Sequence, residues 1–346
     1  MEQRRNHLLA RGPLLDEKGR LADAGYHTAL VKQYDRKAIR AGKSRIKEWD
    51  YYLVYNERFA LALTIDDNGY MGLDSCSFLH FGTRFQHTKS PMVLFPFGKR
   101  NMPVSSAQGD VAVEGKGYAI SFRKQGASRV LDCWFDHFFD KKPLHAHVVL
   151  MDRGEDSMVI ATPFQKKDTA FYYNQKIVCM PAEGYVDFDG ERYDFSPENS
   201  FGILDWGRGV WTYHNIWYWG SGSGVVNGER FGFNIGYGFG NTSAASENML
   251  FYKGRAHKLD DVTFHIPQKN GKDDFLNPWT FDSSDGRFRM NFIPILDRAA
   301  KTSLCVLKSD QHQVFGRFSG TAVLDDGTEL KLKDFLGFAE KVENKW

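Results

Sequence analysis

The stretch of the chain with the clearest chemical potential runs from Phe201 to Gly224, FGILDWGRGVWTYHNIWYWGSGSG. Its titratable side chains include Asp205, Arg208 and His214. Four tryptophans stand among them: Trp206, Trp211, Trp217 and Trp219. Soluble proteins rarely gather so much aromatic surface beside charge unless it lines a cavity or an interface. The stretch therefore predicts a site for an apolar or mixed ligand.

Asp205 is the first candidate for a catalytic group. Burial among tryptophans would raise its pKa, unless a partner such as Arg208 lowers it again. A carboxylic acid with a raised pKa could donate a proton to an alkene or a leaving group near neutral pH. The alternative is a structural Asp205–Arg208 pair that fixes a turn or joins two parts of the fold.

The residues from Trp211 to Trp219 are predicted to form a strand with two different faces. One face would carry Trp211, Tyr213, Asn215, Trp217 and Trp219, and the other would carry His214. Indole rings with two polar tips suit an amphipathic pocket, and their faces could stabilise a carbocation. Tyr213 or His214 would assist proton transfer. In the alternative interpretation, the tryptophan face fills a core between sheets and His214 is a hydrogen-bonded structural residue.

A second strand is predicted from Phe231 to Gly240, FGFNIGYGFG, with large side chains at odd positions and small ones at even positions. A face of glycines allows a neighbouring element or a ligand to approach the backbone, and close packing is the favoured cause. Asn234 and Tyr237 are assigned from this strand as ligand-binding candidates. Trp206, in the stretch from Phe201 to Gly224, is also assigned as a ligand-binding candidate.

Three further polar residues complete the predicted site. Glu247 and Asn248 follow the glycine-rich strand, and Glu340 lies near the end of the chain. Each could bind the ligand, and the two acids could serve as second acidic groups. Salt bridges that close a barrel explain such acids equally well.

Metal and nucleotide sites are not expected. His145 and His147 would share a strand face, with His137 upstream, but the spacing supplies no further ligands. The sequence GSGSG from Gly220 is neither a dinucleotide-binding motif nor a phosphate-binding loop. No serine lies in a GxSxG elbow. We therefore expect no metal and no cofactor.

Composition is that of an ordinary globular protein. The 346 residues carry 45 basic and 43 acidic side chains, so the net charge of +2 gives no reason to expect a nucleic-acid partner. Aromatic residues make up 15 % and there are 33 glycines, which favours β structure. The four cysteines are widely spaced, which argues against a disulfide framework.

The start of the chain, MEQRRNHLLARGP, lacks the apolar region of a secretory signal, and no apolar run is long enough to span a bilayer. We expect a reduced, cytoplasmic protein without an integral membrane segment; the oligomeric state is left open. The basic residues between Arg36 and Lys47 are interpreted as part of an arm that packs on the body, with a membrane-surface or anionic-ligand role as the alternative.

From Trp49 onward the sequence predicts an all-β fold. Two strands, Trp49–Tyr55 and Phe59–Ile65, flank a turn, and similar runs recur about every ten residues. These runs are Tyr118–Phe122, Val130–Phe135, His145–Leu150, Ser157–Thr162 and Phe171–Met180.

A faint internal repeat predicts two related halves. The segments from Tyr185 to Phe195 and from Thr321 to Leu332 each contain an Asp-Gly pair that suits a two-residue type I′ hairpin turn. We therefore predict an N-terminal arm over residues 1–45, a first barrel half over 46–205 and a second over 206–346.

The chain resembles the bacterial family named domain of unknown function 2804. The matching motifs, in one order along nearly the whole chain, are Lys47–Tyr52, Phe171–Lys176, Leu204–Gly209, Gly232–Gly236, Glu247-Asn248, Gly337–Glu340 and Trp346. More distantly it is similar to the calycin-like group of carotenoid hydratases and Diels–Alder-type cyclases. That similarity implies two tandem lipocalin-like antiparallel β-barrels, a hydrophobic substrate, no metal and no nucleotide.

Two functions follow as hypotheses. One is a cofactor-independent enzyme, a hydratase or an isomerase or cyclase, that converts a hydrophobic small molecule, with Asp205 as the proton donor. The other is a non-catalytic carrier of a lipid-like or isoprenoid-like ligand. A purely structural role would leave the barrels filled with side chains.

Overall fold

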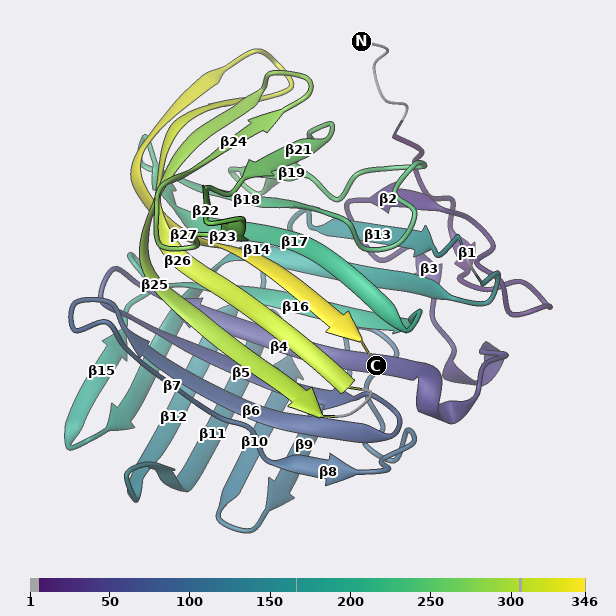
Figure 1. Ribbon diagram of the computed structural model, residues 1–346, viewed down its shortest axis with the longest axis horizontal. Coiled ribbons are helices and arrows are strands. Elements are labelled where there is room, and N and C mark those ends of the chain that lie inside the picture. The colour runs from purple at the N-terminus through teal and green to yellow at the C-terminus, as the bar shows by residue number, and fades with distance from the viewer. Residues whose placement is uncertain (1–5, 166, 305–306, 346) are drawn as a thin grey trace.

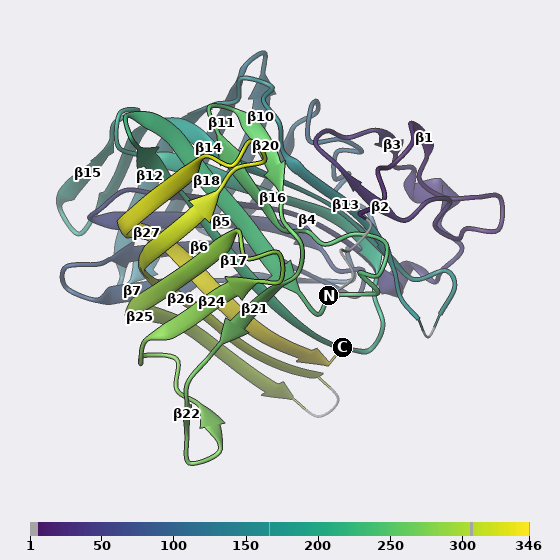
Figure 2. The same ribbon diagram turned by 90° about the horizontal axis from the view of Figure 1, so that it is seen from above.

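Two large antiparallel sheets make up most of the protein. The computed structural model describes residues 6–165, 167–304 and 307–345. One sheet has 14 strands and the other has 9, and Figures 1 and 2 show the second sheet lying across the first. The described helices are two short 3-10 turns, η1 (Arg36–Ala38) and η2 (Lys43–Arg45). The predicted all-β class is confirmed.

The first sheet is built from the N-terminal part of the chain and follows the order β7-β6-β5-β4-β16-β14-β12-β11-β10-β9, with β2, β8, β13 and β15 paired alongside. Its strands are β2 (Gly25–His27), β4 (Ile46–Tyr55), β5 (Phe59–Asp67), β6 (Met71–His80), β7 (Phe85–Lys89), β8 (Met92–Leu94), β9 (Val111–Gly115), β10 (Tyr118–Gln125), β11 (Ser128–Phe139), β12 (Lys142–Met151), β13 (Met158–Pro163), β14 (Phe171–Phe188), β15 (Glu191–Phe195) and β16 (Phe201–Val210).

The second sheet is built from the C-terminal part and follows the order β20-β19-β18-β17-β27-β26-β25-β24-β21. Its strands are β17 (His214–Val226), β18 (Glu229–Tyr237), β19 (Met249–Tyr252), β20 (Arg255–Lys258), β21 (Val262–His265), β24 (Trp279–Ser283), β25 (Phe288–Leu304), β26 (Leu307–Val323) and β27 (Glu329–Lys345). Two small ladders remain, β1 (Gly12–Pro13) with β3 (Lys32–Gln33) and β22 (Gln268–Lys269) with β23 (Lys272–Asp273).

Each large sheet curls around its own apolar interior. The end strand β9 approaches β5, and β21 approaches β18, so the ends of each sheet come near one another. Alternating apolar side chains supply the cores, for example Ile120 and Phe122 in the first and Phe231, Phe233 and Ile235 in the second. The seven strands predicted between Trp49 and Met180 are all present; six have bounds within four residues of the prediction, and β14 continues eight residues further, to Phe188.

The N-terminal segment packs on the first sheet. Leu9, Leu14, Tyr34 and Ile39 are buried in the first core, and β2 pairs with β13. Apolar anchors therefore tie this segment to the body, which agrees with the interpretation of an arm that packs there. The chain passes from the first sheet to the second between β16 and β17, while the division into two barrel domains at residue 205 stays a prediction.

The glycine face of β18 receives the first sheet. A Cβ atom on Gly232 would lie 2.4 Å from Cys179 Sγ and 3.2 Å from Val178 Cγ2, both on β14 of the first sheet, whereas one on Gly236 would lie 2.8 Å from Glu247 Oε1 in the segment after β18. The large residues of β18 point the other way, into the second core. Close packing between the sheets thus explains the alternation.

The two Asp-Gly hairpins differ. Asp189 and Gly190 both have positive φ, 56° and 80°, as a type I′ turn requires. In the second hairpin the residues from Leu324 to Thr328 form a longer loop, closed by the hydrogen bond from Leu324 N to Thr328 O, and Gly327 has a φ of 85°. The two-residue turn predicted at Asp326-Gly327 is therefore wrong, because Asp326 does not adopt the left-handed conformation.

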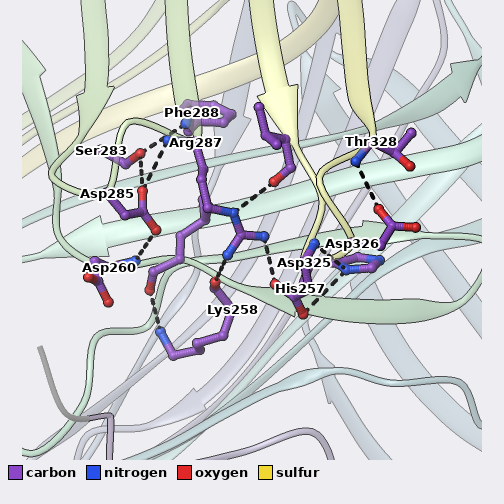
Figure 3. A network of polar contacts seen from close by, with 12 residues as sticks. His257, Lys258, Asp260, Ser283, Asp285, Arg287, Phe288, Asp325, Asp326 and Thr328 are labelled. Atoms are coloured by element: carbon purple, nitrogen blue, oxygen red, sulfur yellow. Dashed lines mark hydrogen bonds and ion pairs between the residues drawn. The ribbon is translucent and has the colours of Figure 1, made fainter. Parts of the chain in front are cut away.

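Arg287 ties together the strand ends of the second sheet (Figure 3). Its guanidinium donates to the carbonyls of Val323 (3.0 Å) and Lys258 (2.7 Å) and to Asp325 Oδ1 (2.6 Å). The neighbouring Asp285 accepts hydrogen bonds from the backbone N–H of Asp260 and from the Ser283 hydroxyl. This network joins the end of β20 to the β24–β25 turn and the β26–β27 loop.

Among the described residues, no helix combines the length and apolarity that a membrane crossing needs. Cys76, Cys133 and Cys179 are buried free thiols, and Cys305 lies outside the described residues.

Candidate functional site

Two rows of polar and aromatic side chains face each other where the sheets meet. Strand register places Tyr51, Asp205 and Lys176 side by side across β4, β16 and β14 of the first sheet. The second sheet places Gln313, Glu340 and Trp219 side by side across β26, β27 and β17. The rows touch at both ends: Tyr51 Oη lies 3.3 Å from Gln313 Oε1, and Lys176 Nζ lies 3.8 Å from the centre of a Trp219 ring.

Asp205 forms a buried ion pair with Lys176. Its Oδ2 lies 2.8 Å from Lys176 Nζ, and its Oδ1 accepts a hydrogen bond from the side-chain amide of Asn174. Asp205 is 8 % exposed and Lys176 is 3 % exposed. Asp205 is therefore buried, with a lysine rather than an arginine as its partner.

Glu340 is the most strongly perturbed acid at this interface. Burial raises its pKa to about 7, against the opposing effects of the Trp217 hydrogen bond and the positive charge of Lys176. Its Oε1 accepts a hydrogen bond from Trp217 Nε1 at 2.9 Å, and its Oε2 accepts one from Gln313 Nε2 at 3.1 Å. At neutral pH such a group can both hold and release a proton.

Glu247 completes a carboxyl cluster, which we define as Asp205, Glu247 and Glu340 around Lys176. Burial raises the pKa of Glu247, while Lys176 lowers it. The hydroxyl of Tyr172 lies near all three acids: burial raises its pKa well above the usual value, and each of the acids raises it further. Three carboxyl groups thus lie around one buried ammonium group. Ionising all three at once would cost electrostatic free energy, because their negative charges would exceed the single positive charge.

Aromatic rings enclose one side of the cluster. This ring wall consists of Trp49, Tyr172, Trp211, Trp217 and Phe239, with ring centroids 4.7–6.0 Å apart. Trp49 and Trp217 are its half-buried members. The wall therefore meets solvent at these two rings.

Arg208 and Trp206 lie on the opposite face of β16 from Asp205. Arg208 is fully buried; its Nη2 lies 2.9 Å from Asp50 Oδ1 and its guanidinium donates to the carbonyls of Trp49, Gly207 and Pro103. The anticipated Asp205–Arg208 pair is therefore wrong, because side chains three residues apart on a strand point to opposite faces. Trp206 packs edge-on against Tyr34 and Tyr173 on that same face.

The predicted site residues at and just before the start of β17, Tyr213, His214 and Asn215, lie away from the carboxyl cluster. Tyr213 is 50 % exposed, and His214 is an exposed residue whose Nε2 lies 3.1 Å from Glu343 Oε1. Asn215 is buried but bonds locally to Thr212. The predicted strand breaks at Thr212 and Tyr213, so Trp217 and Trp219 are the members of the predicted face that reach the cluster, and Trp211 reaches the ring wall.

Of the candidates on β18 and just after it, Asn234 lies at the site, whereas Tyr237 and Asn248 make structural contacts. Asn234 accepts a hydrogen bond from Trp219 Nε1 at 2.7 Å and donates to the carbonyl of Glu247 at 2.9 Å. Tyr237 stacks on Tyr218 on the other face of the sheet. Asn248 holds strands together, since its Oδ1 accepts from Gly236 N at 2.7 Å.

Two cavities lie away from the carboxyl cluster. One, of about 10 Å³, lies inside the first sheet beside Asp50, Tyr52 and Arg129 and has room for about one water molecule. The other, of about 410 Å³, is an open depression over β24 and β25.

Sequence reasoning missed several residues of the interface. Tyr172, Asn174 and Lys176 alternate along β14 and all point toward the second sheet, and Tyr51 and Gln313 close the two rows. The sequence did contain an indication of Lys176. It is a lysine that shares a strand face with Tyr172 and Asn174, in a strand that is buried over most of its length.

The histidines form no metal centre in the described part of the chain. His145 and His147 do share a face, as predicted, where both pack near Tyr185, and His147 Nδ1 lies 2.7 Å from Asp132 Oδ1. Within the described residues, no group of three or more His, Cys, Asp or Glu side chains is arranged to hold a metal ion.

Comparison with solved structures supports the lipocalin-like fold. Kievitone hydratase from Nectria haematococca superposes with a TM-score of 0.51 at 12 % sequence identity, over 91 % of this chain and 96 % of that protein. A provisionally named ATTH from Nitrosomonas europaea gives a TM-score of 0.51 at 12 % identity, over 91 % and 98 %. The distant resemblance to the calycin-like hydratase group is thereby confirmed at the level of the fold.

Sequence comparison places the chain in a family. No curated protein sequence matches it significantly. Residues 5–346 match the family described as domain of unknown function (DUF2804), as the motifs around Asp205 and Glu340 indicated. The chain belongs to the DUF2804 family.

Proposed function

We propose that the protein binds a hydrophobic small molecule between its two sheets and converts it by acid–base chemistry, as a hydratase, isomerase or cyclase without a cofactor. The observation that carries this proposal is Glu340, whose pKa is raised to about 7 among aromatic rings and beside an ion pair. Buried acids of this kind are typical of sites that transfer protons near neutral pH.

The roles follow from the contacts of each group. Glu340 would donate its proton to an alkene carbon of the ligand, and the positive charge that develops would be stabilised by the nearby carboxylates of the cluster. In a hydration, water would attack the cationic carbon and release a proton to a carboxylate of the cluster, Asp205 or Glu247. In an isomerisation, the same carboxylate would remove a proton from the neighbouring carbon.

Asp205 acts differently in this proposal from the role anticipated for it. Its side chain forms an ion pair with Lys176 and accepts a hydrogen bond from the Asn174 amide. It therefore serves as the base or as the fixed negative charge, and Glu340 becomes the donor. Lys176 keeps the cluster from carrying three uncompensated negative charges.

The proposal is tested by following solvent hydrogen. The purified protein would be loaded from a cell extract of apolar metabolites, and the molecules that it retains would be recovered after incubation in D₂O and examined by mass spectrometry. Conversion by Glu340 introduces deuterium at carbon. We expect wild type and Glu343→Gln, a change outside the cluster on the same strand, to do this, and Glu340→Gln to retain the ligand without deuterium incorporation.

Other outcomes point away from catalysis. Retention of the same molecules by wild type with no deuterium and no change of mass would support the carrier function instead. Absence of any retained apolar molecule would refute both binding functions and leave the carboxyl cluster as a structural element that joins the sheets.

A further inference from the structure

Four consecutive apolar side chains face solvent at the edge of the first sheet. Met92, Val93, Leu94 and Phe95 are 58 %, 38 %, 65 % and 56 % exposed. They form β8 and the residue after it, and β8 lies at the margin of the first sheet, on β6 (Figure 1). Such runs are avoided on protein surfaces unless another surface covers them.

The backbone of this apolar loop, residues 92–97, is held firmly. Phe95 N donates to the carbonyl of Tyr70 at 2.9 Å, and Phe97 N donates to that of Gly69 at 3.1 Å. Phe95 and Phe97 have φ of 55° and 49°, a costly conformation for bulky residues, and their rings stack. The two backbone hydrogen bonds hold this conformation, in which Phe95 is exposed and Phe97 is half-buried.

The surroundings of the apolar loop are positively charged. No Asp or Glu occurs between Asp74 and Asp110. Lys89 and Lys99 are exposed within that stretch, and among the described residues neither has a carboxylate within 4.0 Å. The loop therefore has a basic rim with little opposing charge.

The basic N-terminal segment adds to this rim. A Cβ atom on Gly69 would lie 2.5 Å from the carbonyl oxygen of Lys43, so η2 packs directly against the turn that anchors the apolar loop. Lys43 is exposed, as are Lys37 and Arg40 before it. Tertiary structure thus brings the basic run near the start of the chain beside the exposed apolar residues.

We propose that the apolar loop and its basic rim dock on the anionic surface of a lipid bilayer. The side chains from Met92 to Phe95 would enter the boundary between headgroups and acyl chains, while the lysines and arginines meet anionic headgroups. Apolar side chains that point outward beside exposed lysines match the two layers of such a surface, an apolar interior beneath anionic headgroups. This proposal stands independently of the chemistry at the carboxyl cluster.

The test is co-sedimentation of the full chain with vesicles. One set contains phosphatidylcholine alone and the other also contains about 30 % phosphatidylserine. We expect at least about tenfold stronger partition into the anionic set, and a decrease with added salt. Leu94→Asp with Phe95→Asp should abolish most of the binding, while Leu276→Asp, at a leucine that is 61 % exposed elsewhere, should leave it unchanged.

Charge reversal separates the two contributions. Lys89→Glu with Lys99→Glu should weaken partition into anionic vesicles by at least about fivefold per lysine and leave the weak partition into phosphatidylcholine unchanged. Circular dichroism confirms that all variants are folded. The proposal is overturned if wild type binds neither vesicle, or if the Leu94/Phe95 variant binds as wild type does. It is also overturned if the loop proves to join two copies of the chain, shown by a dimer that this variant dissociates.

Discussion

Glu340→Gln should remove a pH dependence of stability that is centred on the interface between the sheets. In the native protein burial raises the pKa of Glu340 from 4.5 to about 7. Native Glu340 thus keeps its proton between these pH values, whereas the unfolded chain releases it. The native state binds more protons there, so the free energy of unfolding must fall as the pH rises from about 4.5 to about 7.

The size of the effect follows from the same two values. One pKa unit corresponds to about 1.4 kcal/mol, so the interval from 4.5 to about 7 amounts to about 3 kcal/mol. This contribution to the free energy of unfolding is an upper value, because rearrangement of the side chains around an ionised Glu340 would reduce it. Glutamine resembles the protonated acid in shape and charge, and Gln313 can turn its amide to present an oxygen to the new NH₂ group. The variant should therefore resemble wild type near pH 5 and exceed its stability by about 2–3 kcal/mol at pH 8.

The assay is equilibrium urea unfolding between pH 5 and pH 8, followed by tryptophan fluorescence. Asp66, whose pKa burial also raises to about 7, titrates in both proteins and cancels in the difference. Glu198→Gln is the matched control: hydrogen bonds, the largest from Ser196, lower the pKa of this exposed acid, so its stabilising effect is lost only toward acid pH. Parallel curves for wild type and Glu340→Gln across this range would refute the reasoning.

Three further substitutions test the contacts around the site. Asp205→Asn should destabilise the protein by about 3–5 kcal/mol in urea unfolding, because it leaves the Lys176 ammonium buried without its ion pair. Adding Lys176→Met to this variant should restore part of the lost stability. Equal stability of the single and double variants would contradict this. Arg287→Met should cost about 2–4 kcal/mol and increase amide hydrogen exchange at the strand ends that it joins, whereas unchanged exchange there would show that the network is dispensable. Gly232→Ala should lower the free energy of unfolding by about 1–3 kcal/mol, because the added methyl group would meet the first sheet. Gly42→Ala, at a position with open space, should leave the free energy of unfolding nearly unchanged in the same thermal or urea titration.

Much of the local structure could be predicted from residue patterns. Alternation in Phe231–Tyr237 correctly separates a core face from a face of close approach, because successive side chains on a strand always point to opposite sides. The same rule, applied to Asp205 and Arg208, would have excluded their pairing. The turn at Asp189-Gly190 was predictable because those residue types tolerate positive φ, whereas Asp326-Gly327 lies in a longer loop that the dipeptide alone does not specify.

The composition of the site depended on the tertiary structure. Asp205 was recognisable in the sequence as an acid among aromatic residues, and Glu340 as an acid in the Gly337–Glu340 motif. The pattern along β14 could mark Lys176 as unusual, but its ion pair with Asp205 could not be predicted, because that partner lies on an adjacent strand. The chain by itself determined which side chains alternate on each strand and that the fold is all-β. Only the packing of one curled sheet against the other decided which acids share a cation and which of them stays protonated near neutral pH, because pKa values respond to burial and to neighbours that are distant in sequence.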